Sequence, residues 1–168
     1  MKLWILDADV IIDLLSLGVF DNLLKHCQLH LSTTVIEEVR FYKTGRAKIQ
    51  INFRTDYVNT RKVIEESATV DDLKEITELL PMAIKRGIGP GELESLAVLN
   101  KNRNLVFCSM DGLAIKSLPF LDLSQNGISV EKLLQKSGIS TKILKEPHME
   151  QYFQTKLKDG QELKITGF

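Results

Sequence analysis

Short apolar runs alternate with amphipathic stretches along most of the chain. Residues 2–6 and 105–109 have the continuous apolar pattern of buried strands, and residues 28–31 alternate as a half-buried strand does. Segments with helical spacing of apolar residues lie between these runs. Strands that alternate with helices predict a mainly parallel sheet with helices on both faces, which is an α/β fold with three layers, α/β/α. The helices are expected near 10–17, 20–26, 35–41, 73–80, 92–99, 111–118 and from 129 onward.

Polar residues before two of these helices have the spacing of N-terminal caps. Thr34 and Glu37 have capping-box spacing ahead of the helix near 35–41. The pair Asp71-Asp72 precedes an apolar helical pattern that Pro81 ends or kinks. We therefore expect these residues to fix the beginnings of their helices.

Three segments have less distinctive patterns. Residues 42–66 contain an alternating run, KIQINF, and a second stretch, VNTRKVIEE, that fits a strand or a helix equally well. Residues 121–123 have the pattern of a short strand. Residues 141–168 have helical spacing around Tyr152 and Phe153, and their last part fits either a strand or irregular structure.

The composition fits one compact domain in a reducing compartment. The chain has 168 residues, of which 43% are hydrophobic, enough for one sizeable core. Its 22 basic and 22 acidic residues cancel, so a nucleic-acid partner would have to be bound by a local patch. Cys27 and Cys108 have neither disulfide-framework nor zinc-knuckle spacing. No apolar run reaches the roughly 18 residues of a membrane span. We expect a cytoplasmic protein without a membrane partner.

Acidic residues recur where predicted strands and loops meet helices. Asp7 and Asp111 each follow a predicted strand, and ligands of parallel sheets bind beyond the carboxyl ends of the strands, at a topological switch point. Each acid alone also fits a helix cap or a favourable position in the helix dipole. The residues concerned are Asp7, Asp9, Glu37, Glu38, Glu92, Glu94 and Asp111.

Carboxylates that gather at one place need a cation. Three or four of them within roughly 4 to 6 Å would repel one another by about 3 to 4 kcal/mol per pair at an effective dielectric constant of about 20. Carboxylate oxygens and water match Mg²⁺ or Mn²⁺, and the lack of a Cys/His cluster argues against zinc. The sequence therefore suggests a site for a hard divalent cation.

Four stretches, LDADVIIDL, TTVIEEV, GPGELESLAVL and CSMDGLAIKSL, follow one another in the chain. In this order they resemble the motifs of the PIN domain family, a group of metal-dependent ribonucleases that includes the toxins of VapC-type toxin-antitoxin pairs. The third resembles the GE-x-E helix of a subgroup in which Glu replaces the more common Asp. The resemblance implies a PIN-like nuclease core over residues 1–123, with residues 124–168 as an α-rich extension packed on the same domain.

The resemblance also implies an activity, an endoribonuclease that hydrolyses RNA phosphodiesters with Mg²⁺ or Mn²⁺. Asp9 would be a secondary metal ligand, and Glu94 is the alternative to Glu92. Ser109 is expected to bind a carboxylate or the substrate phosphate. A toxin of this kind has an antitoxin partner that covers its acidic groove, and a homodimer is a further expectation. The implied catalytic residues and metal ligands are Asp7, Glu38, Glu92 and Asp111.

Basic and aromatic residues are interleaved in one stretch. Residues 40–62 contain seven basic residues and one acid, together with Phe41, Tyr42, Phe53 and Tyr57. Such a mixture suits phosphate contacts with base stacking, and it fits a solvated basic loop equally well. The residues expected to bind RNA are Arg40, Lys43, Arg46 and Lys48.

Two other functions are consistent with the same residues. The sequence DADV also resembles the DxDx[TV] opening of haloacid-dehalogenase-like phosphatases, in which the first Asp is a nucleophile and the second a general acid. A PIN-shaped binding module without catalytic activity is the other alternative. A trapped aspartyl-phosphate would support the phosphatase, and a lack of Mn²⁺ binding would support the module.

Overall fold

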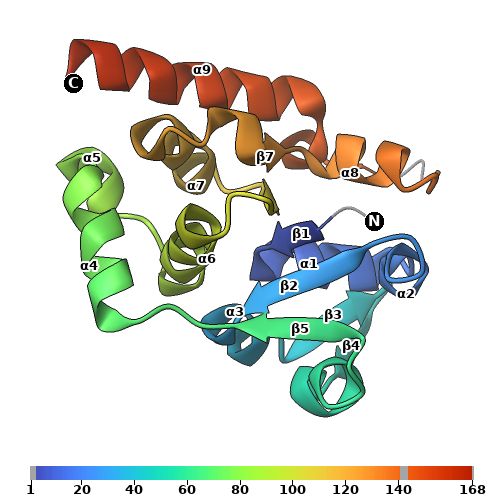
Figure 1. The fold of residues 1–168 in the computed structure, drawn as a ribbon. Coiled ribbons are helices and arrows are strands. Elements are labelled where there is room, and N and C mark those ends of the chain that lie inside the picture. Colours follow the sequence, from blue (N-terminus) through green and yellow to red (C-terminus); the bar gives the residue numbers. More distant parts are fainter. Residues whose placement is uncertain (1–2, 141–143, 168) are drawn as a thin grey trace.

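A five-stranded sheet lies at the centre of the computed structural model, which describes residues 3–140 and 144–167. The strands lie side by side in the order β5-β2-β1-β6-β7, and every neighbouring pair is parallel. The prediction of an α/β fold with a mainly parallel sheet is therefore confirmed (Figure 1). The strands are β1 (Leu3–Leu6), β2 (Gln28–Ser32), β5 (Val63–Glu66), β6 (Val106–Cys108) and β7 (Gly127–Ile128).

The strand order reverses between β1 and β6. From β1 the chain proceeds outward to β2 and β5, and it then returns to the other side of β1 to form β6 and β7. Such a reversal is a topological switch point, where parallel sheets bind their ligands beyond the carboxyl ends of the strands. Leu6 lies beside Cys108 in the register. Asp7 and Ser109 directly follow these two strands, so they lie side by side at the edge of the sheet.

Helices cover both faces of the sheet. Successive residues of each strand point to opposite sides, so one strand contributes side chains to the cores on both faces. Trp4 and Leu6 belong to one buried core, and Ile5 belongs to the other. This arrangement is compatible with a three-layer α/β/α sandwich. The first core includes residues of α1 (Ala8–Ser16), α2 (Phe20–Leu23), α3 (Thr33–Glu38) and α8 (Val130–Lys136), and the second those of α4 (Val70–Leu79), α5 (Met82–Lys85), α6 (Pro90–Lys101), α7 (Gly112–Ser117) and α9 (Glu150–Thr166).

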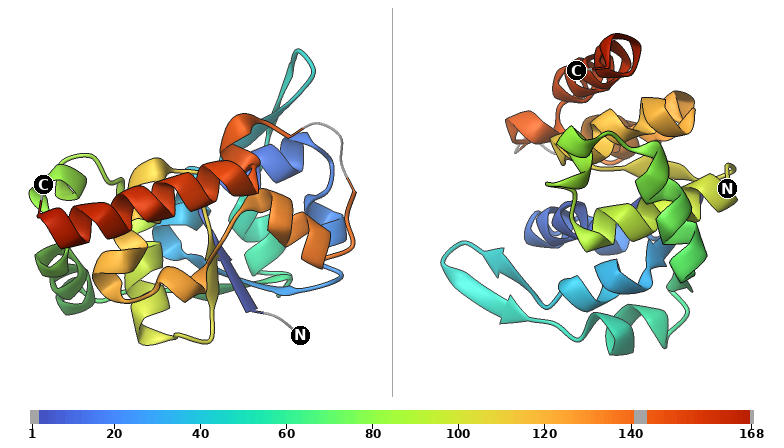
Figure 2. Two further views of the ribbon diagram at one scale, coloured as in Figure 1. Left: turned by 90° about the horizontal axis from the view of Figure 1, so that it is seen from above. Right: turned by 90° about the vertical axis from the view of Figure 1, so that its left-hand side faces the viewer.

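The C-terminal part of the chain packs on both faces of the same sheet. Leu133 of α8 lies in the first core, and Phe153 of α9 lies in the second. The long helix α9 runs across α7 (Figures 1 and 2). A Cβ atom on Gly160 of α9 would lie 2.5 Å from the carbonyl oxygen of Lys116 in α7. The missing side chain of Gly160 therefore lets these two helices approach closely.

Two predicted helix starts were wrong by a few residues. Ser32, not Thr34, caps α3, because its hydroxyl directly follows β2 and accepts the N–H of Val35 at 3.3 Å. That helix ends at Glu38 instead of continuing to residue 41. Thr69 caps α4 and forms a reciprocal capping box with Asp72, so the capping role predicted for Asp71-Asp72 belongs to the preceding threonine.

Residues 42–66, whose sequence pattern fits more than one kind of element, contribute to an antiparallel hairpin, formed by β3 (Phe41–Thr44) and β4 (Ala47–Gln50). The hairpin projects from the body of the molecule (Figure 2). An irregular helical turn, Arg54–Val58, joins it to β5. The short strand predicted at 121–123 was wrong: Leu118–Leu121 is a 3-10 turn that ends in the left-handed Asp122, with a φ of 54°. The alternating Leu-Asp-Leu pattern of three residues is too short to distinguish a strand from a buried turn.

The remaining elements are short. Two further 3-10 turns cover Ser124–Asn126 and Glu146–His148. The predicted helical spacing around Tyr152 and Phe153 corresponds to α9, but this helix continues to Thr166, where a strand or irregular structure was expected. Residues 141–143 and 168 lie outside the described residues. Within the described ranges, none of the helices combines the length and the apolar composition that crossing a membrane requires.

Candidate functional site

Asp7 lies at the junction between β1 and α1. It caps α1, with an extended backbone, and its Oδ1 accepts the N–H of Val10 at 3.0 Å. The other carboxylate oxygen accepts the hydroxyl of Ser109. Asp7 is only 1% exposed. Burial raises the pKa of Asp7 to about 7 against the opposing effect of these hydrogen bonds, and the charges of Glu92 and Asp9 raise it further.

Ser109 and Asp111 lie at the corresponding junction between β6 and α7. The Ser109 hydroxyl donates to Asp7 and accepts the backbone N–H of Asp111 at 3.0 Å. Asp111 caps α7 through Oδ1, which accepts the N–H groups of Leu113 and Ala114, both at 2.8 Å. A continuous chain of hydrogen bonds therefore joins the ends of the two central strands.

Glu38 reaches the same region from the last position of α3. A Cβ atom on Gly91, in the first turn of α6, would lie 2.7 Å from Glu38 Oε2. The glycine therefore leaves the space that this carboxylate occupies. Burial raises the pKa of Glu38, and repulsion from Glu92 and Asp9 adds to the effect. The neighbouring Glu37 instead interacts with the guanidinium of Arg54.

Glu92 lies in the first turn of α6 and folds back over its N-terminus. A Cβ atom on Gly89 would collide with Glu92 Oε2. Burial raises the pKa of Glu92; hydrogen bonds from the backbone N–H groups of Glu92 itself and Gly89 oppose this rise, while the charges of Asp111 and Asp9 add to it. Glu92 is thus coupled electrostatically to acids from three other elements.

Glu94, the alternative to Glu92, has a different environment. Its Oε2 accepts the backbone N–H of Thr34 at 2.8 Å, and its Oε1 accepts that of Ala68 at 3.3 Å. Glu94 is buried, at 7% exposure. It joins α3 to the segment before α4, so its carboxylate already has a structural role.

Asp9 belongs to α1 and not to β1. The strand ends at Leu6, and Asp9 lies exposed in the first turn of the helix. Its charge nevertheless raises the pKa values of Asp7, Glu38 and Glu92. Asp9 therefore lies within electrostatic range of the other acids, at the solvent side of the group.

We call the group of Asp7, Asp9, Glu38, Glu92 and Asp111 the acidic cluster. In the described part of the chain, no Lys or Arg is among the groups that shift the pKa values of Asp7, Glu38 and Glu92. All donors are oxygen atoms, as Mg²⁺ and Mn²⁺ prefer. However, no three His, Cys, Asp or Glu side chains of residues 3–140 and 144–167 lie close enough to hold one ion together. The donors fit in type and charge, but their carboxylates are not preorganised around a single point.

The four residues expected to bind RNA lie on or next to the hairpin, and all are exposed. Lys43 of β3 and Lys48 of β4 face each other directly across the ladder. Lys48 Nζ lies 3.9 Å from the centroid of the Phe41 ring. Like charges in opposite positions of a ladder are destabilising, so an anion bound there would relieve the repulsion. Arg40 precedes β3, and Arg46 lies in the turn.

Other members of the basic and aromatic stretch are part of the core, contrary to the stacking role considered for them. Phe53 and Tyr57 are 2% and 7% exposed and stack with ring centroids 4.7 Å apart. Phe20 completes this aromatic group. Arg54 forms a bidentate pair with Glu65, at 2.6 and 2.8 Å. Phe53, Tyr57 and Arg54 are therefore removed from the candidate RNA-binding surface, whereas the hairpin remains in it.

Sequence reasoning missed two residues beside the acidic cluster, Tyr152 and Lys156. Both belong to α9 and lie over Gly112, the residue after Asp111. A Cβ atom on Gly112 would lie 3.2 Å from the Tyr152 hydroxyl and 3.5 Å from Lys156 Cδ. The sequence carries no signal for this contact, because it depends on how α9 packs against α7.

No family model, curated protein or solved structure matches this chain. The chain is thus defined by its parallel α/β fold and by an acidic cluster at the switch point of its sheet.

Proposed function

We propose that this chain is a metal-dependent endoribonuclease with a PIN-like core. The observation that supports this most strongly is the acidic cluster itself. Carboxylates that follow β1 and β6 and carboxylates of α3 and α6 are coupled at the switch point, and burial and mutual repulsion raise the pKa values of three of them. A hard divalent cation would remove this repulsion.

The proposed metal ligands are Asp7, Glu38, Glu92 and Asp111. Ser109 would orient the carboxylate of Asp7 by its hydrogen bond, and Gly91 leaves room for that of Glu38. Asp111 uses Oδ1 to cap α7, so its Oδ2 is the donor that we assign to the ion. Bound Mg²⁺ or Mn²⁺ would supply a water of lowered pKa and stabilise charge on a scissile phosphodiester.

The two alternative functions have less support. A phosphatase of the haloacid dehalogenase type would need Asp7 as an accessible nucleophile, but Asp7 is 1% exposed and both of its oxygens accept hydrogen bonds. A binding module without catalytic activity has no reason to keep uncompensated carboxylates. Measured Mn²⁺ binding separates the nuclease from the module.

The hairpin is the proposed contact for the RNA backbone. Its exposed Lys43 and Lys48, with Arg40 and Arg46, would bind phosphates of a single strand. Replacing Lys43, Arg46 and Lys48 together by alanine is expected to reduce the salt dependence of RNA affinity, measured by filter binding. An unchanged dependence would remove the hairpin from the proposal. The antitoxin partner and the homodimer stay predictions from the resemblance.

Cleavage of a mixed RNA pool tests the proposed function. The wild-type chain should cleave RNA with Mg²⁺ or Mn²⁺, and a chelator should stop the reaction. Loss of several kcal/mol of transition-state stabilisation by the ion predicts a rate about 1000-fold lower for Asp111→Asn. Asparagine retains the cap on α7, so the variant should remain folded by circular dichroism. Asp13→Asn, which changes an acid outside the cluster, is the matched control and should cleave normally. Cleavage by Asp111→Asn at the wild-type rate would contradict the assignment.

A further inference from the structure

Tyr152 and Lys156 of α9 form a wall beside the acidic cluster. The Tyr152 hydroxyl and the aliphatic part of Lys156 lie against Gly112, with Tyr152 Oη, Lys156 Cδ and Lys156 Cε at 3.2, 3.5 and 3.6 Å from a Cβ atom placed on that glycine. The carboxylate of Asp111 contributes to a raised pKa of Tyr152, after burial and ahead of Glu146. This places the tyrosine within electrostatic range of the cluster.

The position of this wall is fixed by packing along one face of α9. Phe153 and Leu157 are 1% and 8% exposed and anchor the helix in the second core. Gly160 lets the backbone of α9 touch that of α7 at Lys116, where a Cβ atom would lie 2.5 Å from the carbonyl oxygen. Tyr152 and Lys156 thus lie on a rigid helix, held against the element that Asp111 caps.

The ammonium group of Lys156 can change partners at low cost. It lies 5.3 Å from the centroid of the Tyr152 ring and 3.9 Å from Asp159 Oδ2. Asp159 also has Lys116 as a partner, at 3.5 Å. Asp159 would therefore keep a cation if Lys156 turned toward a ligand. Lys156 also lines a hollow of about 270 Å³, together with Glu146, Gln151, Tyr152 and Thr155.

An acidic cluster alone repels the phosphates of an RNA strand. Like charges at close range repel one another, so a site that brings RNA to carboxylates needs positive charge next to them. A lysine ammonium and a tyrosine hydroxyl are both hydrogen-bond donors to phosphate oxygens. Lys156 and Tyr152 provide both donors at the edge of the cluster, next to Asp111.

We infer that Lys156 and Tyr152 bind one phosphate of an RNA strand beside the acidic cluster and so position the strand for cleavage. This inference rests on the proposed function. It also assigns a role to the C-terminal helix: α9 supplies the basic wall of a site whose acids come from the sheet and from α3 and α6.

The test measures binding and cleavage by the full-length chain. Binding uses an RNA oligonucleotide whose 2′-hydroxyls are methylated, so that it cannot be cleaved by transfer to that oxygen, with EDTA present to stop hydrolysis. Lys156→Ala should weaken binding by about tenfold, as expected for a charge-assisted hydrogen bond, and should lower the salt slope by about 0.7. With cleavable RNA and Mn²⁺, the same variant should raise KM about tenfold and change kcat less than twofold.

Conservative and control variants separate this role from a structural one. Lys156→Arg should restore most of the affinity, and Tyr152→Phe should weaken it by less than Lys156→Ala. Lys158→Ala changes an exposed lysine of the same helix, which pairs with Glu162 at 3.8 Å, and should behave as wild type. Thermal unfolding of each variant checks that α9 stays docked.

The binding assay tests the role of Lys156, and the cleavage assay tests the proposed function. Binding by Lys156→Ala with wild-type affinity and salt slope would overturn the inference, whatever the cleavage assay shows. Absence of metal-dependent cleavage by the wild-type chain would overturn the proposed function, while the binding assay still decides whether Lys156 contacts RNA.

Discussion

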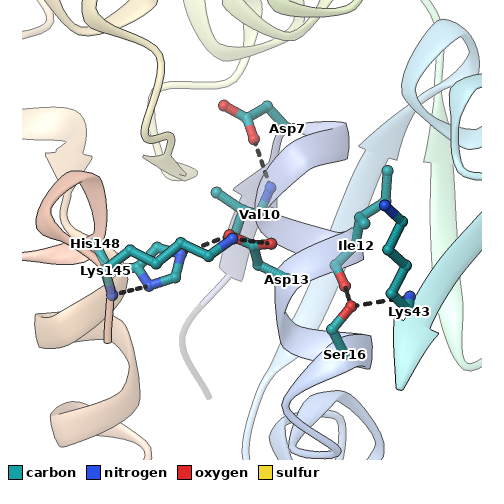
Figure 3. Close-up of polar contacts among 8 residues, drawn as sticks. All are labelled: Asp7, Val10, Ile12, Asp13, Ser16, Lys43, Lys145 and His148. Atoms are coloured by element: carbon teal, nitrogen blue, oxygen red, sulfur yellow. Dashed lines mark hydrogen bonds and ion pairs between the residues drawn. The ribbon is translucent and has the colours of Figure 1, made fainter. Parts of the chain in front are cut away.

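Asp7, which caps α1, and Asp13, in the second turn of the same helix, have opposite electrostatic environments, shown together in Figure 3. Asp13 has a cation at both oxygens and a second donor beside it: Lys145 Nζ lies 3.0 and 3.1 Å from the two oxygens, and His148 Nε2 lies 2.7 Å from Oδ2. His148 Nδ1 accepts the backbone N–H of Lys145, so Nε2 carries the proton that it donates to Asp13. This clamp holds the segment before α9 on α1.

Among the residues that the structure describes, Asp7 has hydrogen-bond partners but no compensating cation. Its partners are a backbone N–H and the Ser109 hydroxyl, and the charges that act on it are those of Glu92 and Asp9. The difference separates a structural carboxylate from a candidate functional one, although the two residues are of the same type and lie on the same helix. Glu94 and Glu92 of α6 show the same contrast, because backbone N–H groups of two other segments bind Glu94.

Asp7→Asn gives the largest effect on stability that this comparison predicts. The pKa of Asp7 rises from 3.8 to about 7 on folding, so ionised Asp7 destabilises the metal-free protein at pH 8 by about 4 kcal/mol. Asparagine can still accept the N–H of Val10 and has no charge. The variant should therefore have the higher free energy of unfolding in urea with EDTA at pH 8. A variant less stable than wild type under these conditions would contradict the proposed difference between Asp7 and Asp13.

Asp13→Ala should have the opposite sign. The substitution leaves the Nε2 of His148, which is 1% exposed, without its acceptor, at a cost of about 1 to 3 kcal/mol. Lys145 adds little because its side chain is 65% exposed. Asp13→Asn, which keeps an acceptor, should lose less. Urea unfolding at pH 7 measures both variants, and equal losses would show that the hydrogen bond to His148 is not the important contact.

The raised pKa of Asp7 also predicts how stability depends on pH. Between pH 4 and 7 the folded state binds the proton of Asp7 and the unfolded state releases it. The contribution of Asp7 to the free energy of unfolding is thus fully present below pH 4. It is lost as pH rises through 7, and the free energy of unfolding falls by up to about 1.4 kcal/mol per pH unit over this range. Asp7→Asn should remove this slope. Identical pH profiles of the unfolding free energy for wild type and Asp7→Asn, measured in urea with EDTA, would show that a group other than Asp7 causes the pH dependence.

Much of the fold and the places of two members of the acidic cluster could be predicted from the pattern of the sequence. The strand before Asp7 and the one before Asp111 have continuous apolar patterns, and their helices follow at once, so both acids could be assigned to the carboxyl ends of parallel strands. The hairpin could not be predicted, because alternation in residues 42–66 fits an isolated hairpin and a sheet strand equally well. Contacts between elements could not be predicted from the sequence either. Whether Glu92 or Glu94 joins the cluster depends on which backbone N–H groups lie near each.

Calorimetric titration with Mn²⁺ at pH 6.5 tests the central claim most directly, namely that the acidic cluster is a site for a divalent cation. The wild-type chain should bind the ion and release protons, because Asp7, with a pKa of about 7, is largely protonated before binding. The proton release appears as a dependence of the heat on the ionisation enthalpy of the buffer. Asp13→Asn should bind in the same way, and Asp7→Asn should bind weakly without the same release. No Mn²⁺ binding by the wild-type chain, or equal binding by Asp7→Asn, would contradict the account.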